Sequence, residues 1–125
     1  MSDVLFDPEE IKLIPPGEYC CRIMNSEVKT SSSGNTYVST IIQIIQGSQQ
    51  GRTVDFICHI GATDAKFRFD SRRKFARLVS CCGITTSITD PNVLLDKMLL
   101  VEIGQSKDKF GDMNNILGFK KLQKN

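Results

Sequence analysis

The 125-residue sequence contains no tryptophan and a single histidine, His59. It has no Walker-type glycine loop, no H-E-x-x-H motif and no carboxylate cluster of the kind used by nucleases. We therefore expect neither an enzyme nor a bound metal ion or organic cofactor. No apolar run approaches the ~20 residues of a membrane-spanning helix. The first ten residues, MSDVLFDPEE, are acidic where a signal peptide would be basic, so we expect neither export nor membrane association.

The cysteines are odd in number, and none has the C-x-x-C spacing of a zinc or redox site. Cys58 directly precedes His59, but adjacent strand positions point to opposite faces, so a Cys–His nucleophile is not expected. We expect all of the thiols to be small core side chains in a reducing cytoplasm. They are Cys20, Cys21, Cys58, Cys81 and Cys82.

Positive charge is concentrated in the body of the chain, although the formal net charge is only +2. Four acids and no base lie in residues 1–10, which leaves sixteen bases against ten acids in the remainder. The densest stretch is KFRFDSRRKFAR, residues 66–77, with six bases, one acid and three phenylalanines. A basic surface with interleaved aromatic residues predicts a polyanion as partner, and an ordinary solvated surface is the alternative.

The hydrophobic pattern predicts three strands, a helix and two further strands. Residues 1–16 are expected to form an irregular acidic lead-in, and residues 17–125 a single domain. Period-two alternation and β-branched residues predict strands over 17–30, 36–47, 52–60, 97–106 and 114–122. Spacing of i, i+3, i+4, i+7 from Phe75 to Cys82 predicts an amphipathic helix, capped by Asp70 or Ser71 and ended at Gly83.

This order of elements is typical of the OB fold, a five-stranded antiparallel barrel with one α-helix between strands 3 and 4. Closure into a barrel is favoured because it removes exposed strand edges. The alternative is an open α+β sheet with the helix on one face. We therefore predict a mainly-β protein with an OB-type barrel.

In an OB barrel the ligand face is formed by strands 2 and 3 and is flanked by the loops that join strands 1–2 and 4–5. These loops correspond to KTSSSGNTY (29–37) and SKDKFGDMN (106–114), each with lysine, an aromatic residue and glycine. Lysines can contact phosphates, and an aromatic face can stack a base. Tyr37 and Phe110 are therefore the candidate stacking residues. The candidate phosphate contacts at the groove are Lys29, Arg52, Lys107 and Lys109.

The basic stretch adds Lys66, Arg68, Arg72 and Arg73 as candidate DNA contacts. On the predicted helix, Arg72, Arg73, Lys74 and Arg77 would extend the path of a wrapped strand, pair with carboxylates of a second subunit, or remain a solvated face. Phe67 and Phe69 either pack under the helix or contact DNA. Asn114 or Asn115 either bonds a base or shapes the turn into the last strand.

Three stretches, PPGEYCCRIMNSEVKTSSSGNTYVSTIIQIIQGSQQGRTV, FARLVSCCGI and FGDMNNILGF, resemble a phage-encoded family of small proteins formerly of unknown function. Genes of that family lie beside replication and recombination genes. The resemblance runs from about Pro15 to Phe119 and implies an OB fold and single-stranded DNA (ssDNA) binding. Many single-strand binders end in an acidic tail, whereas this chain ends in KKLQKN.

We therefore expect a cytoplasmic protein, in the host cell if phage-encoded, that coats or protects ssDNA during phage replication or recombination. The alternative is an OB-type interaction module that recruits a replication or recombination protein without significant DNA affinity. The expected partners are ssDNA, such replication or recombination proteins, and further copies of this chain in a homo-oligomer. Without tryptophan, the strongest stacking residue, the affinity per base is expected to be modest.

Overall fold

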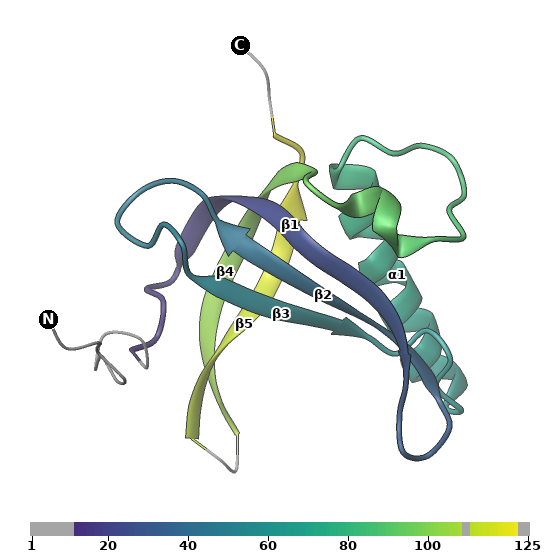
Figure 1. Cartoon of the computed structure of the whole chain (residues 1–125). Coiled ribbons are helices and arrows are strands. Elements are labelled where there is room, and N and C mark those ends of the chain that lie inside the picture. The colour runs from purple at the N-terminus through teal and green to yellow at the C-terminus, as the bar shows by residue number, and fades with distance from the viewer. Residues whose placement is uncertain (1–11, 109–110, 123–125) are drawn as a thin grey trace, which may run out of the picture.

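The computed structural model describes residues 12–108 and 111–122, with the backbone alone at residue 108. It confirms a mainly-β protein of five antiparallel strands with one α-helix between strands 3 and 4 (Figure 1). Within the described residues, no helix is long and apolar enough to cross a membrane. The elements are β1 (Gly17–Thr30), β2 (Thr36–Ile44), β3 (Thr53–Cys58), α1 (Ala65–Cys81), the 3₁₀ helix η2 (Pro91–Leu94), β4 (Met98–Asp108) and β5 (Gly111–Lys120).

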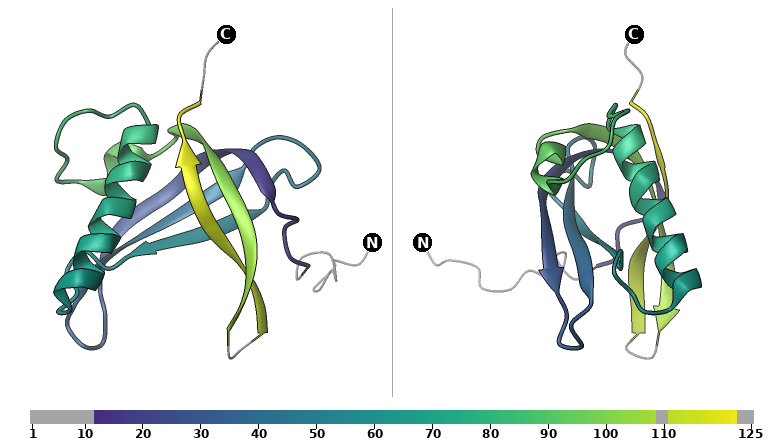
Figure 2. Two further views of the ribbon diagram at one scale, coloured as in Figure 1. Left: turned by 180° about the vertical axis from the view of Figure 1, so that it is seen from behind. Right: turned by 90° about the vertical axis from the view of Figure 1, so that its right-hand side faces the viewer.

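The strands form one sheet in the order β3-β2-β1-β4-β5. β1 is the central strand because its first part pairs with β4 and most of its length pairs with β2. A register shift between Ile23 and Asn25 accompanies this change of partner. Bulges of this kind bend a strand and increase its twist. The sheet accordingly curves so that β2 and β3 lie on one side and β4 and β5 on the other (Figure 2).

The predicted closure into a barrel is wrong, because β3 and β5 remain the two edges of the sheet. The two edges approach each other through side chains: the rings of Phe56 and Phe119 pack edge-to-face with centroids 4.9 Å apart. A closing ladder would need the two backbones themselves to run only about 4.8 Å apart. Helix α1 contacts both β3 and β5 and lies beside the open side of the sheet (Figures 1 and 2).

The core lies inside the curved sheet and is closed at one end by α1. As the period-two alternation predicts, Cys21, Ile23, Ile42 and Ile44 are buried, and Leu78 of the helix packs with them. The five cysteines are all free thiols, three of them buried and two half-buried. Each fully buried aliphatic side chain contributes roughly 1.5–3 kcal/mol, so this apolar cluster is the main source of stability.

Helix α1 begins at Ala65, six or seven residues before the predicted start, because its N-cap is Asp64 and not Asp70 or Ser71. Its N-cap is Asp64, whose Oδ1 accepts a hydrogen bond from the backbone N–H of Phe67 at 2.9 Å. The apolar stripe used for the prediction begins only at Phe75, so the periodicity missed the first turns, which carry no buried apolar side chain. The end was predicted correctly, since Gly83 follows the helix with φ +86°.

The lead-in is attached to the sheet at Ile14, which is buried. The side-chain amide of Asn114 accepts from the Ile14 N–H at 2.8 Å and donates to the Ile14 carbonyl at 2.9 Å. It also donates to the Gly104 carbonyl at 3.0 Å. Asn114 therefore joins the lead-in to β4 and β5. The two predicted roles, bonding a nucleobase and shaping the turn into the last strand, did not include this one.

Candidate functional site

The stretch 29–37 forms a compact hairpin between β1 and β2. The Ser31 N–H donates to the Asn35 carbonyl at 2.8 Å, and the Gly34 N–H donates to the Ser31 carbonyl at 2.9 Å. Gly34 has φ +88°, a backbone conformation that favours glycine. This hairpin and the strand ends of the β4–β5 hairpin project from the same end of the molecule (Figure 2).

Three rings lie in a row beside this hairpin, and we call them the ring row: Tyr37, His59 and Phe67. The centroids of Tyr37 and His59 are 5.9 Å apart with the planes inclined at 41°. Those of His59 and Phe67 are 5.2 Å apart and inclined at 34°. Tyr37 and His59 are half-buried, and Phe67 is 50% exposed. The row therefore presents aromatic surface to solvent.

Each ring is positioned by a different element. In the β2–β3 ladder Val38 pairs with Cys58, which brings Tyr37 and His59 together one residue further along. Phe67 lies in the first turn of α1 and is fixed there by the Asp64 cap. Tyr37 is also the cross-strand partner of Lys29. The ring row thus joins the start of β2, the segment after β3 and the start of α1.

The segment that carries His59 is held by two of the predicted DNA contacts. Arg72 donates from Nε to the Ile60 carbonyl at 3.0 Å, and Arg68 donates from Nη1 to the Ala62 carbonyl at 2.9 Å. A guanidinium has five N–H donors, so each keeps others for an external acceptor. Arg68 and Arg72 are therefore positioning residues for the ring row in addition to candidate contacts.

The exposed side chains of α1 are strongly basic. Lys66 and Arg73 are both exposed, and the Arg73 guanidinium lies over the Phe69 ring at 5.8 Å from its centroid. Such a cation–π contact holds a guanidinium in place while its edge remains free to bond an anion. Phe69 is 60% exposed, so it packs on the outside of the helix and not beneath it.

The expected ligand face of β2 and β3 and the neighbouring β1 carry no net positive charge, in contrast to α1: the three strands together contain two basic and three acidic residues. Lys29 lies 3.9 Å from the carboxylate of Glu27. Asp55 of β3 pairs with Ile41 of β2 and is exposed. Ion pairs between exposed side chains contribute at most about 1 kcal/mol, so Lys29 remains available to a phosphate. The face as a whole, however, offers a polyanion little net attraction.

The chain matches the family described as "Protein of unknown function (DUF669)" over residues 5–125. It belongs to that family. No curated protein matches the sequence. Within the described part of this DUF669 protein, no group of three His, Cys, Asp or Glu side chains is arranged to hold a metal ion.

Two of the remaining predicted contacts of the DUF669 protein, Arg52 and Lys107, are not part of the ring row. Arg52, near the opposite end of β2, donates to the Lys12 carbonyl and to Oε1 of Gln49 at 3.3 Å. The Lys107 side chain is 84% exposed and lies 4.0 Å from the Asp112 carboxylate. The predicted contacts Lys109 and Phe110 lie outside the described residues.

Sequence reasoning did not select His59 as a site residue, and it left Phe67 undecided. One signal was available for His59: it follows the alternating residues of the predicted strand 52–60, and the pairing of this strand with β2 places residue 59 opposite residue 37. No comparable signal existed for Phe67, because its place depends on where α1 begins. The contact between them is a consequence of tertiary structure.

Proposed function

We propose that this protein binds ssDNA through the ring row and the neighbouring cations, and that it coats or protects single strands during phage replication or recombination. It would act in the cytoplasm of the host cell and assemble as a homo-oligomer. The observation that carries the proposal is the ring row, in which the exposed ring of Phe67 lies next to two half-buried rings. Phe67 stands at the start of α1, a helix with six basic residues and one acidic residue. Aromatic surface beside a basic helix is the combination by which proteins bind single strands.

The mechanism combines stacking with phosphate contacts. Each base that stacks on an aromatic side chain contributes about 1–3 kcal/mol, whatever its identity, since every base has a π-face. Two lysines are direct neighbours of the row: Lys29, opposite Tyr37 in the β-ladder, and Lys66, next to Phe67 in the chain. Their contacts with phosphates release counterions, so affinity should fall steeply with salt. Duplex DNA should bind more weakly because its bases are already stacked and paired.

The test is fluorescence anisotropy of a labelled oligo-dT at low and moderate salt, with unlabelled duplex as competitor. Phe67→Ala should weaken binding about 5- to 150-fold, the equivalent of about 1–3 kcal/mol. The fold should survive, since half of the Phe67 surface is already solvated. Leu117→Ala is the matched control, because Leu117 is a comparably exposed apolar side chain (59%) on β5. No binding of the wild-type protein at low salt would refute the proposal.

A protein-interaction module is the second candidate, and the open sheet favours it. Among the described strands, β3 and β5 each have one edge without a partner strand. An extended peptide can add to such an edge through main-chain hydrogen bonds. This candidate predicts negligible affinity for oligo-dT and a tight complex with a replication or recombination protein.

A further inference from the structure

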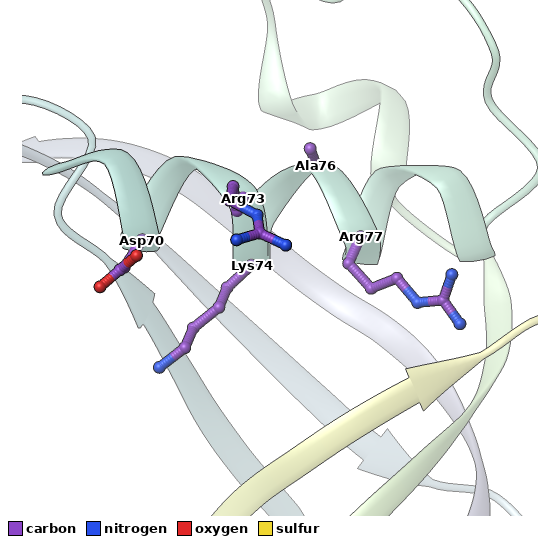
Figure 3. A pocket seen from close by; sticks show the side chains of 5 residues that line it. All are labelled: Asp70, Arg73, Lys74, Ala76 and Arg77. Carbon is purple, nitrogen blue, oxygen red and sulfur yellow. The ribbon is translucent and has the colours of Figure 1, made fainter. Parts of the chain in front are cut away.

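We propose that a second part of the site binds phosphates in a cleft on α1, so that the strand follows the helix and does not cross the outer face of β2 and β3. This inference rests on the proposed function. The α1 cleft has a volume of about 630 Å³ and is lined by Asp70, Arg73, Lys74, Ala76 and Arg77 (Figure 3).

The spacing of these residues places the charges together. Asp70, Arg73, Lys74 and Arg77 follow the pattern i, i+3, i+4, i+7, which is one face of an α-helix. Figure 3 shows Asp70, Lys74 and Arg77 leaving the same side of α1, with the Arg73 guanidinium beside them. Phe69 restrains that guanidinium from the preceding turn. The α1 cleft is therefore an ordered surface with a net charge of +2.

The cations of the α1 cleft are not neutralised within the protein. Among the described residues, none of Arg73, Lys74 and Arg77 forms an ion pair, although Asp70 lies one turn away. All three are exposed, so they are hydrated and accompanied by mobile counterions in the free protein. A phosphodiester chain gains entropy by displacing such ions, and this gain favours a polyanion over a single small anion.

The α1 cleft continues from the ring row. Phe67 and Arg77 are ten residues apart, which is about 15 Å along a helix. That length corresponds to about four nucleotides at the 3.4 Å spacing of a stacked strand. Lys74 also lies near the end of β3, since its charge acts on the buried thiol of Cys58. A strand with a base on Phe67 can therefore place the phosphates about three and four nucleotides further along at Lys74 and Arg77.

The alternative path over the sheet is less favourable electrostatically. It would pass Glu27 and Asp55, each of which repels a phosphate, and its cations are Lys29 and Lys107 at the two hairpins. The two paths thus use different pairs of basic side chains: Lys74 and Arg77 along α1, and Lys29 and Lys107 over the sheet. This difference provides a matched comparison, in which each double variant removes two positive charges.

The experiment measures the affinity of full-length protein for oligo-dT of increasing length, from two nucleotides upward, over a range of salt. For Lys74→Gln/Arg77→Gln we expect unchanged affinity for the shortest oligonucleotide and a loss of tenfold or more for the longer ones. The slope of log affinity against log salt should decrease by about 0.7 for each lost phosphate contact. Asp70→Asn should strengthen binding of the longer oligonucleotides only.

Lys29→Gln/Lys107→Gln is the comparison variant. If it alone reduces the affinity and salt slope for long oligonucleotides, the strand crosses the sheet and the inference is overturned. Equal affinity of Lys74→Gln/Arg77→Gln and wild type at every length also overturns it, while the proposed function stands. Absence of binding by the wild-type protein refutes the proposed function itself, so the two failures are distinguishable. Circular dichroism of each variant checks that the fold is intact.

Discussion

The contact between Phe56 and Phe119 allows a quantitative test of how the open sheet is held together. Phe119 is only 6% exposed, and its ring meets Phe56 edge-to-face with centroids 4.9 Å apart. Replacing a buried phenylalanine by alanine costs about 3–5 kcal/mol, of which the ring pair accounts for about 0.5–1.5 kcal/mol. No β-ladder joins β3 to β5, so main-chain hydrogen bonds cannot compensate for the lost ring.

Phe119→Ala should therefore remove about 3–5 of the ~5–15 kcal/mol that stabilises a typical domain, which is at least about a fifth of it. Phe119→Leu retains most of the apolar volume and should cost only about 1–1.5 kcal/mol, close to the value of the ring pair. Urea unfolding followed by circular dichroism measures both free energies. A double-mutant cycle with Phe56→Leu isolates the coupling between the two rings.

The expected coupling is about 0.5–1.5 kcal/mol in favour of the wild-type pair. Hydrogen exchange gives a local measurement: the amides of β3 and β5 should lose more protection in Phe119→Ala than those of β1. If Phe119→Ala lowers the free energy of unfolding by less than about 1 kcal/mol and leaves the denaturant slope unchanged, the reasoning is refuted. It would mean that helix α1 and the remaining core hold the edges together without the rings.

Two further predictions concern buried polar groups. Asn114→Ala removes three hydrogen bonds and leaves the Ile14 N–H without its side-chain acceptor, while the Ile14 carbonyl keeps the bond from the Gln105 amide at 3.1 Å, so unfolding should become easier by about 1–3 kcal/mol; a midpoint equal to wild type in urea would contradict this. Burial raises the pKa of the Cys58 thiol from 9.0 to about 12, so the unfolded chain ionises first as pH rises. The stabilising contribution of this neutral thiol is complete below pH 9 and is lost between about pH 9 and 12. Urea unfolding across this range should show falling stability, with a shallower fall in Cys58→Ala; an identical slope in both proteins would argue against it.

The sequence was most informative where neighbouring residues decide the structure. Alternation predicted β1 to β3, because the period of a strand follows from which side chains must face the core. Gly83 correctly marked the end of α1, since a positive φ there suits glycine. The start of α1 was missed because the Asp64 cap and the first turns contribute no apolar side chain to the core pattern.

The candidate site was only partly predictable for a related reason. Residues 66–77 were predicted to meet a polyanion from their charge and interleaved aromatic residues, and that expectation stays a prediction. Composition does not reveal, however, that Arg68 and Arg72 hold backbone carbonyls while Lys74 and Arg77 line a cleft. These roles depend on the direction of each side chain from the helix, which follows from where α1 starts and what it packs against.

The sequence by itself determined the five strands, the helix between strands 3 and 4, the burial of three of the five thiols and the basic character of residues 66–77. These depend on local periodicity and on the chemistry of each residue type. Only the tertiary structure decided that the sheet stays open between β3 and β5, and that Tyr37, His59 and Phe67 form one row. Both depend on contacts between segments far apart in the chain, whose geometry is set by strand register, sheet curvature and the packing of α1.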